Sequence, residues 1–147
     1  MTNMRGQANK RSGTALVEFS LTAFLLVTTL LSVVEMTRFL LIYTTLANAA
    51  RAGARYAIVH GADRSGVGVN GPSGTGNVSQ VQTVVQNFAS TGALNVNNLT
   101  VNVTYPTDNQ VGSTVIVQAI YPYDPFVGWF TPLSLNLRSS SRGVITY

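Results

Sequence analysis

The sequence predicts an α+β protein in which one long N-terminal helix is followed by a short helix and a three-stranded antiparallel sheet. Three observations support this: an uninterrupted apolar run near the N-terminus, a glycine-rich break after residue 59, and apolar–polar alternation toward the C-terminus. They divide the 147 residues into a leader (1–13), a transmembrane segment (14–34), a helical stalk (35–59), a linker (60–77) and a small α+β domain (78–147).

The apolar run at residues 14–34, TALVEFSLTAFLLVTTLLSVV, predicts a membrane anchor. A transmembrane helix needs about 20 apolar residues, and this run contains one charge, Glu18. A secretory signal peptide would have a shorter apolar core and a small-residue cleavage site after it. Here the helical pattern continues instead to about Val59.

Basic residues near the anchor predict its orientation. Arg5, Lys10 and Arg11 precede it in the leader, whereas Glu35 nearly cancels Arg38 on the far side. Because positive charge is retained in the cytoplasm, we expect a cytoplasmic N-terminus and an extracytoplasmic C-terminal domain.

The composition argues against several functional classes. The chain has no cysteine, a single histidine and five acidic residues, with no metal-ligand cluster of usable spacing. A catalytic triad would need His60, in or beside a loop, although catalysis requires positioned groups. The net charge of +4 forms no basic stripe interleaved with aromatics. We therefore predict a non-enzymatic protein without a cofactor, metal, small-molecule substrate or nucleic-acid partner.

Three stretches in the first part of the chain carry a family resemblance. They are Arg11-Ser-Gly-Thr-Ala-Leu-Val-Glu-Phe19, Glu35-Met-Thr-Arg38 and Asn48-Ala-Ala-Arg-Ala-Gly-Ala-Arg-Tyr-Ala57. In this order and spacing they resemble TadE-like proteins, minor pseudopilins of the tight-adherence (Flp-type) pilus machinery. The resemblance covers about residues 11–59. Family members often carry a proline near the position of Ala23-Phe24, which this chain lacks.

The resemblance implies processing and assembly in the bacterial inner (cytoplasmic) membrane. A prepilin peptidase would cut between Gly13 and Thr14, where the missing side chain of Gly13 suits a narrow protease cleft. Glu18 would then be the fifth residue of the mature chain and would pair with the N-terminal amine of a neighbouring subunit. The implied partners are other pilins or pseudopilins and pilus-assembly components. In an isolated anchor, Glu18 would instead stay near the headgroups or be protonated.

The stalk carries two candidate assembly surfaces. Ala49, Gly53 and Ala57 recur every four residues, and small residues at this spacing let another backbone approach closely. The approaching element is a partner helix or the chain's own C-terminal domain, and the two can both approach on different faces. Arg51 and Arg55 lie on another face, which is either a docking surface or a solvated face that complements the helix dipole.

The linker and the short helix follow from glycine content and periodicity. Residues 60–77 are rich in glycine and predict a loop. They include a literal G-x-G-x-x-G, but a helix rather than a strand precedes it, so dinucleotide binding is not predicted. A short helix is expected at 78–89 with Ser79 as its N-cap. Its apolar face is formed by Val81, Val84, Val85 and Phe88.

Alternating apolar residues predict three strands connected as a meander. The strands are expected at 99–105, 114–121 and 133–147. A bulge is expected at Gly143 in the third strand. One face of the sheet is expected to pack on the short helix, on the end of the stalk or on both, a pilin-like arrangement.

A proline-rich aromatic loop separates the second and third strands. Its aromatic residues are Tyr121, Tyr123, Phe126, Trp129 and Phe130. They either complete a small core or form a contact surface for a neighbouring subunit, because aromatic side chains are enriched at interfaces.

Three functions are open at this point. The main prediction is a TadE-like minor pseudopilin, a structural component of a pilus-assembly or secretion apparatus. The second is an unprocessed, membrane-anchored accessory or binding module of the cell envelope. The third is a major filament subunit, against which the long polar domain argues, since a Flp-type major pilin is little more than a helix.

Overall fold

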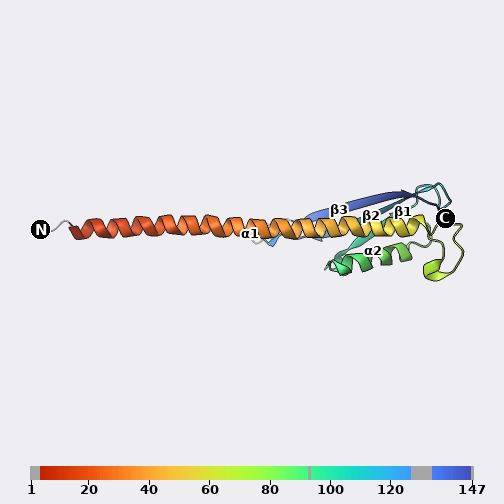
Figure 1. Ribbon diagram of the computed structural model, residues 1–147, viewed down its shortest axis with the longest axis horizontal. Coiled ribbons are helices and arrows are strands. Elements are labelled where there is room, and N and C mark those ends of the chain that lie inside the picture. The colour runs from red at the N-terminus through yellow and green to blue at the C-terminus, as the bar shows by residue number, and fades with distance from the viewer. Residues whose placement is uncertain (1–3, 93, 127–133, 147) are drawn as a thin grey trace. The chain divides into compact units, whose positions relative to one another are not determined.

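The computed structural model describes residues 4–92, 94–126 and 134–146 (Figure 1). Its helices and strands, in chain order, are α1 (Met4–Ile58), η1 (Gly68–Asn70), α2 (Ser79–Thr91), η2 (Val96–Asn98), β1 (Thr100–Thr104), β2 (Thr114–Tyr123) and β3 (Leu135–Val144), where η denotes a 3₁₀ helix. The predicted α+β class is confirmed, with its long helix, short helix and three-stranded sheet. The chain divides into an N-terminal unit, Met1–Arg38, and a C-terminal unit, Phe39–Tyr147, and α1 contributes to both.

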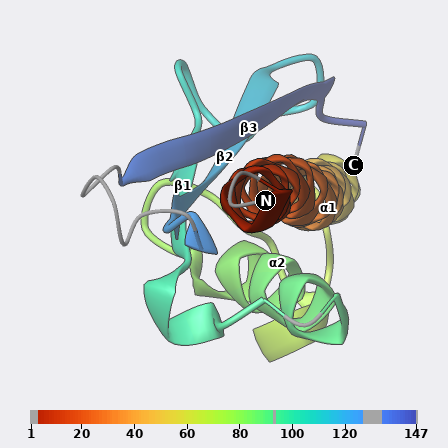
Figure 2. The ribbon, with the colours of Figure 1, turned by 90° about the vertical axis from the view of Figure 1, so that its left-hand side faces the viewer.

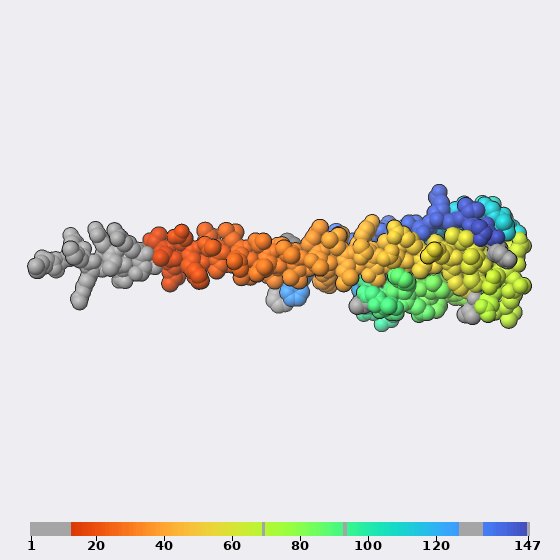
Figure 3. Space-filling model, viewed as in Figure 1, coloured from red at the N-terminus to blue at the C-terminus, as the bar shows by residue number. Residues whose placement is uncertain are grey.

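The N-terminal unit is an apolar helix with exposed side chains. It is helical from Met4, so α1 begins within the leader and not at the apolar run. Leu16, Phe19 and Phe24 are all exposed, and Figure 3 shows side chains of this unit along its visible face. The helix is long and apolar enough to cross a membrane, and other described residues bury none of its most apolar stretch. These properties support single-pass membrane anchoring.

Hydroxyl groups within the apolar run are satisfied inside the helix. The Ser20 hydroxyl donates to the carbonyl of Leu16 at 2.8 Å, and the Thr22 hydroxyl to that of Glu18 at 2.9 Å. The same bond to the carbonyl four residues earlier is made by Thr28, Thr29 and Ser32. Because hydrocarbon offers no hydrogen-bond partners, this internal pairing allows a hydroxyl-rich segment to enter the bilayer.

In the C-terminal unit, α1 lies between α2 and the inner face of the sheet (Figure 2). Gly53 of α1 meets Val81 and Val85 of α2 on one side and Val117 of β2 on the other. The largest fully buried apolar side chains come from both helices, the sheet and the segment after β3: Leu46, Val81, Val85, Val115, Val117 and Ile145. α2 also contacts β1. Both expected packing partners of the sheet, the stalk end and the short helix, are therefore confirmed.

The sheet is an antiparallel meander in the order β1-β2-β3, as predicted. β1 pairs with the centre of β2, where Thr100 lies opposite Ile120. β2 extends to Tyr123, beyond the predicted end, and pairs with the whole of β3. The register runs without interruption from Tyr123 opposite Leu135 to the far end of both strands. The end of β2 and the start of β3 therefore lie together at one end of the sheet.

The predicted bulge at Gly143 is wrong. Gly143 pairs with Val115 in the regular register. A Cβ atom at this position would overlap the side chain of Ile58, so the glycine permits close approach of β3 to α1. The chain after Val144 does not extend the strand, because the Thr146 N–H donates to the carbonyl of Ile58 at 3.0 Å.

The short helix differs from the prediction at its start and on its exposed face. Val78 holds the N-cap position without a side-chain cap, and Ser79 is the first helical residue. The buried side chains of α2 are Val81, Val85 and Ala89, which recur every four residues. Phe88, predicted on the apolar face, is 44% exposed because it lies to one side of this stripe.

Candidate functional site

The predicted cleavage point and Glu18 both lie on the exposed part of α1. Gly13 and Thr14 are exposed, and a Cβ atom at Gly13 would meet no heavy atom within 4 Å. Glu18 is also exposed, and no ion pair to it forms among the side chains that the structure describes. One turn into an apolar segment, such a carboxylate requires water, a proton or a cation from another molecule.

Glu35 and Arg38 form the first charged pair after the apolar run. Arg38 Nη1 lies 3.8 Å from Glu35 Oε1, one helical turn away. The two side chains neutralise each other where the apolar run ends, which suits the boundary between hydrocarbon and headgroups.

The stripe of small residues faces the chain's own domain. Ala49 and Ala57 have no exposed surface, and a Cβ atom at Gly53 would overlap Val85 and lie 3.3 Å from Val117. Of the two alternatives for this stripe, the structure bears out packing against the C-terminal domain. A partner helix would have to displace α2 or β2 to reach these residues, so they offer no assembly surface in this fold.

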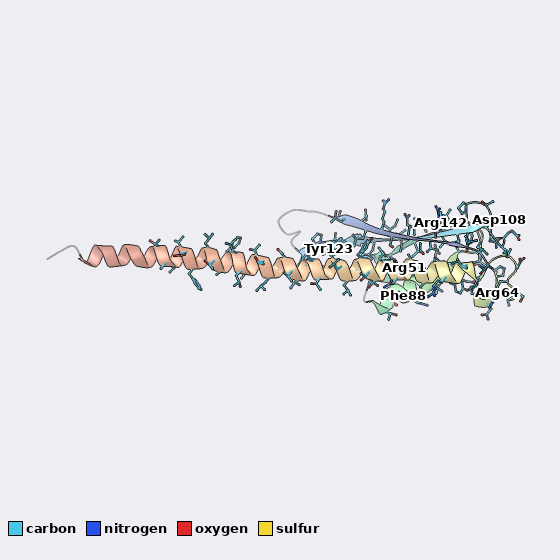
Figure 4. All side chains as sticks on the ribbon, turned by 45° about the horizontal axis from the view of Figure 1, so that its top comes forward. Arg51, Arg64, Phe88, Asp108, Tyr123 and Arg142 are labelled. Carbon is cyan, nitrogen blue, oxygen red and sulfur yellow. The ribbon has the colours of Figure 1, made fainter. Side chains whose placement is uncertain are left out.

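The two arginines of the stalk lie on the opposite, open face. Arg51 and Arg55 are exposed, and Arg51 Nη1 donates to Asn48 Oδ1 at 3.1 Å (Figure 4). Arg55 lies in the last turn of α1, where a cation complements the helix dipole. Neither arginine forms an ion pair with a described carboxylate. This face remains accessible to an acidic partner.

The aromatic residues at the end of β2 and just after it divide into buried and exposed members. Tyr123 is 3% exposed and packs edge-on against Phe39 of α1, with ring centroids 5.5 Å apart. Tyr121 is partly buried against the core, whereas Phe126 is 69% exposed. The two tyrosines therefore contribute to the core, which was one of the two alternatives for these aromatic residues, whereas Phe126 does not. Trp129 and Phe130 lie outside the described residues.

A buried polar cluster, not anticipated from the sequence, ties the linker to the sheet. The hydroxyl of Ser73, which has no exposed surface, donates to the carbonyl of His60 at 2.9 Å and lies 2.8 Å from the hydroxyl of Tyr105. The Asn109 side chain donates to the Ser73 carbonyl at 2.9 Å. His60 thus helps to anchor the loop through its backbone. No local motif could reveal this cluster, because its members are 13 to 36 positions apart.

Burial of Tyr105 makes stability sensitive to alkaline pH. Burial raises the pKa of Tyr105 above its usual value near 10, and the Ser73 hydroxyl only partly opposes this. Burial also raises the pKa of Tyr56. Above about pH 10 the unfolded chain loses these protons before the folded chain does, so the free energy of unfolding should fall as pH rises.

Chemical unfolding of the purified chain on either side of pH 10 measures this fall. In Tyr105→Phe the fall should be shallower, because one of the two phenols with a raised pKa is removed. An identical fall in wild type and Tyr105→Phe would show that Tyr105 does not contribute.

The comparison with protein families agrees with the motif resemblance. Residues 13–55 match the family described as TadE-like protein. Comparisons with curated proteins and with solved structures find no match. The matched range includes the predicted cleavage point, Glu18 and both stalk arginines. Over residues 13–55 this chain is therefore similar to the TadE-like family, the same family that its N-terminal motifs resemble.

Proposed function

We propose that this chain is a minor pseudopilin of a Tad/Flp-type pilus-assembly or secretion apparatus, with a structural and non-catalytic role. It would reside in the bacterial cytoplasmic membrane with its N-terminus in the cytoplasm and its C-terminal unit outside. A prepilin peptidase would remove residues 1–13, and the mature anchor would bundle with the helices of other pilins or pseudopilins. The observation that carries the proposal is Glu18, an exposed acid without an ion-pair partner among the described residues, on an uncovered apolar helix that matches the TadE-like family.

The chemistry of Glu18 supports an intermolecular role. Cleavage before Thr14 would create an ammonium group four residues from this carboxylate in sequence. In a medium of low dielectric constant the two charges attract strongly, but only good geometry offsets the cost of removing them from water. A neighbouring subunit would supply that geometry and thereby fix the axial register of the bundle.

A membrane-anchored accessory module that keeps its leader is the second candidate. It is favoured by the continuity of α1 through Gly13 and Thr14, since this backbone must unwind before an extended substrate can enter a protease cleft. The two candidates differ in the mass of the mature chain. They also differ in whether Glu18 is required.

Intact-mass measurement and a charge-removing substitution test the proposal together. The chain is expressed with its native apparatus, in strains with and without the prepilin peptidase. We expect loss of residues 1–13 only where the peptidase is active. We also expect Glu18→Gln, which keeps size but removes charge, to reduce co-purification with pilus-assembly components at least several-fold.

The matched control is Glu35→Gln, which neutralises the other acid of α1, already paired with Arg38. It should be processed and should co-purify as the wild type does. A leader retained in the presence of active peptidase would reject processing and support the accessory module. Normal co-purification of Glu18→Gln would reject the pairing role.

A further inference from the structure

Exposed leucine and aromatic side chains gather at one end of the C-terminal unit. Leu40, Leu41 and Tyr43 of α1 are 45–57% exposed, Phe126 after β2 is 69% exposed and Leu135 at the start of β3 is 41% exposed. We call these five residues the apolar rim. Elsewhere in the described part of this unit, the exposed large apolar side chains are Phe88 and four valines: Val59, Val67, Val111 and Val144.

Contacts within the C-terminal unit bring the strands to the start of its helix. Tyr123 packs edge-on against Phe39, the first residue of the unit. Leu135 pairs with Tyr123 across the two strands, and Phe126 follows Tyr123 by three residues. The rim residues of the sheet and of α1 therefore lie at the same end (Figure 4, Tyr123 labelled).

Chain connectivity keeps this end close to the bilayer. Phe39 follows Val34, the last residue of the apolar run, by five residues in the same helix. At about 1.5 Å per residue, five residues rise about 7.5 Å. The headgroup layer occupies about 5–8 Å on each side of the hydrocarbon.

From this placement we propose that the apolar rim is a membrane-contact surface that inserts into the headgroup–acyl boundary of the bilayer holding the anchor. Leucine and aromatic side chains bind the headgroup–acyl boundary, and tyrosine and tryptophan are especially enriched there. The valines at the opposite end are smaller and bury less area. Lipid contact would cover the exposed ring of Phe126 and limit tilting of the domain on its anchor.

The acidic residue near the apolar rim indicates that the membrane contact does not depend on negatively charged lipids. Asp124 is exposed between Tyr123 and Pro125. Because this residue is acidic, anionic lipids would not strengthen the contact. Burial of apolar area is the expected source of affinity. The contact should therefore form in vesicles of phosphatidylcholine alone, which carry no net charge, and without any pilus component.

Spin labels at introduced cysteines test this contact, because the chain has no cysteine of its own. Full-length Phe126→Cys and Leu135→Cys proteins are labelled and reconstituted in phosphatidylcholine vesicles at high lipid-to-protein ratio. Collision with molecular oxygen, which concentrates in the bilayer, is compared with collision by a water-soluble nickel complex present on both sides. We expect access of the nickel complex to both labels to be several-fold lower than access to a control label.

The control is Val111→Cys, an exposed position in the turn before β2 at the other end of the unit. Its label should collide freely with the nickel complex. Equal access of the complex to positions 111, 126 and 135 would overturn the proposal. Shielding that appears only when protein is crowded in the vesicles would also overturn it, because the occupant would then be a second copy of the chain. Both results are independent of the pilus role, since no other protein is present.

Discussion

Gly53→Leu should destabilise the C-terminal unit by about 3 kcal/mol, at the upper end of the cost of overfilling a packed core. At an exposed helical position the same substitution would stabilise the helix by about 0.5–1 kcal/mol. Gly53, however, lies where α1 meets two other elements. A Cβ atom there would overlap Val85, and it would lie 3.3 Å from Val117 and 3.5 Å from Val81. The additional leucine carbons have no space unless α2 or the sheet moves.

Guanidinium unfolding of the full chain in detergent, followed by the near-UV circular dichroism of its tyrosines, measures this loss. The matched control is Gly76→Leu, since a Cβ atom at Gly76 meets nothing within 4 Å. That variant should stay within about 0.5 kcal/mol of wild type. Equal stability of Gly53→Leu and wild type would show that α1 does not pack between α2 and the sheet.

Leu46→Ala should cost about 2–5 kcal/mol of unfolding free energy, the range for deleting a buried leucine side chain. Leu46 has no exposed surface and is among the largest fully buried side chains of the unit. Its removal leaves a cavity in the packed core, which the surrounding residues fill only in part. The same unfolding measurement applies.

Leu41→Ala is the control for this substitution because Leu41 lies on the same helix and is 57% exposed. In detergent its stability should match the wild type within about 0.5 kcal/mol. If the two alanine variants lost equal stability, the assignment of α1 residues to the domain core would be wrong. Glu18→Gln, in contrast, is expected to change assembly and not stability, which separates the two roles of α1.

The proposed assembly role and the folding role belong to different segments and faces of α1. The stretch before Arg38 is uncovered and carries the exposed acid, whereas the stretch after it buries its small residues in the domain. The four-residue spacing of Ala49, Gly53 and Ala57 therefore serves folding. In the proposed assembly, subunit contacts would come from exposed surfaces, such as the apolar helix or the open face with Arg51 and Arg55.

The long and local patterns were readable from the sequence. An apolar run free of proline predicted the anchor helix, since a membrane span needs only length and composition. Alternation predicted the strands, and short connections predicted their meander order, because antiparallel neighbours require only a turn between them. The motifs around Gly13, Glu18 and Arg51 predicted the similarity to TadE-like proteins that the family comparison finds over residues 13–55.

The sequence did not predict which helices and strands pack closely against one another. A glycine in a strand is compatible with a bulge or with a helix pressed against it, and only the position of Ile58 showed that Gly143 serves the second purpose. Likewise, a small-residue stripe fits any partner, and only the fold placed α2 and β2 against it. The Ser73–Tyr105 contact joins residues 32 positions apart.

The sequence alone determined that this protein has a long apolar helix, a stretch similar to TadE-like proteins and an α+β fold, because periodicity and composition act within short segments. The tertiary structure decided which faces of α1 are covered, which aromatic residues are buried and where the exposed ones gather. Those properties depend on which distant surfaces fit together. A pattern within a single segment does not predict how distant surfaces pack together.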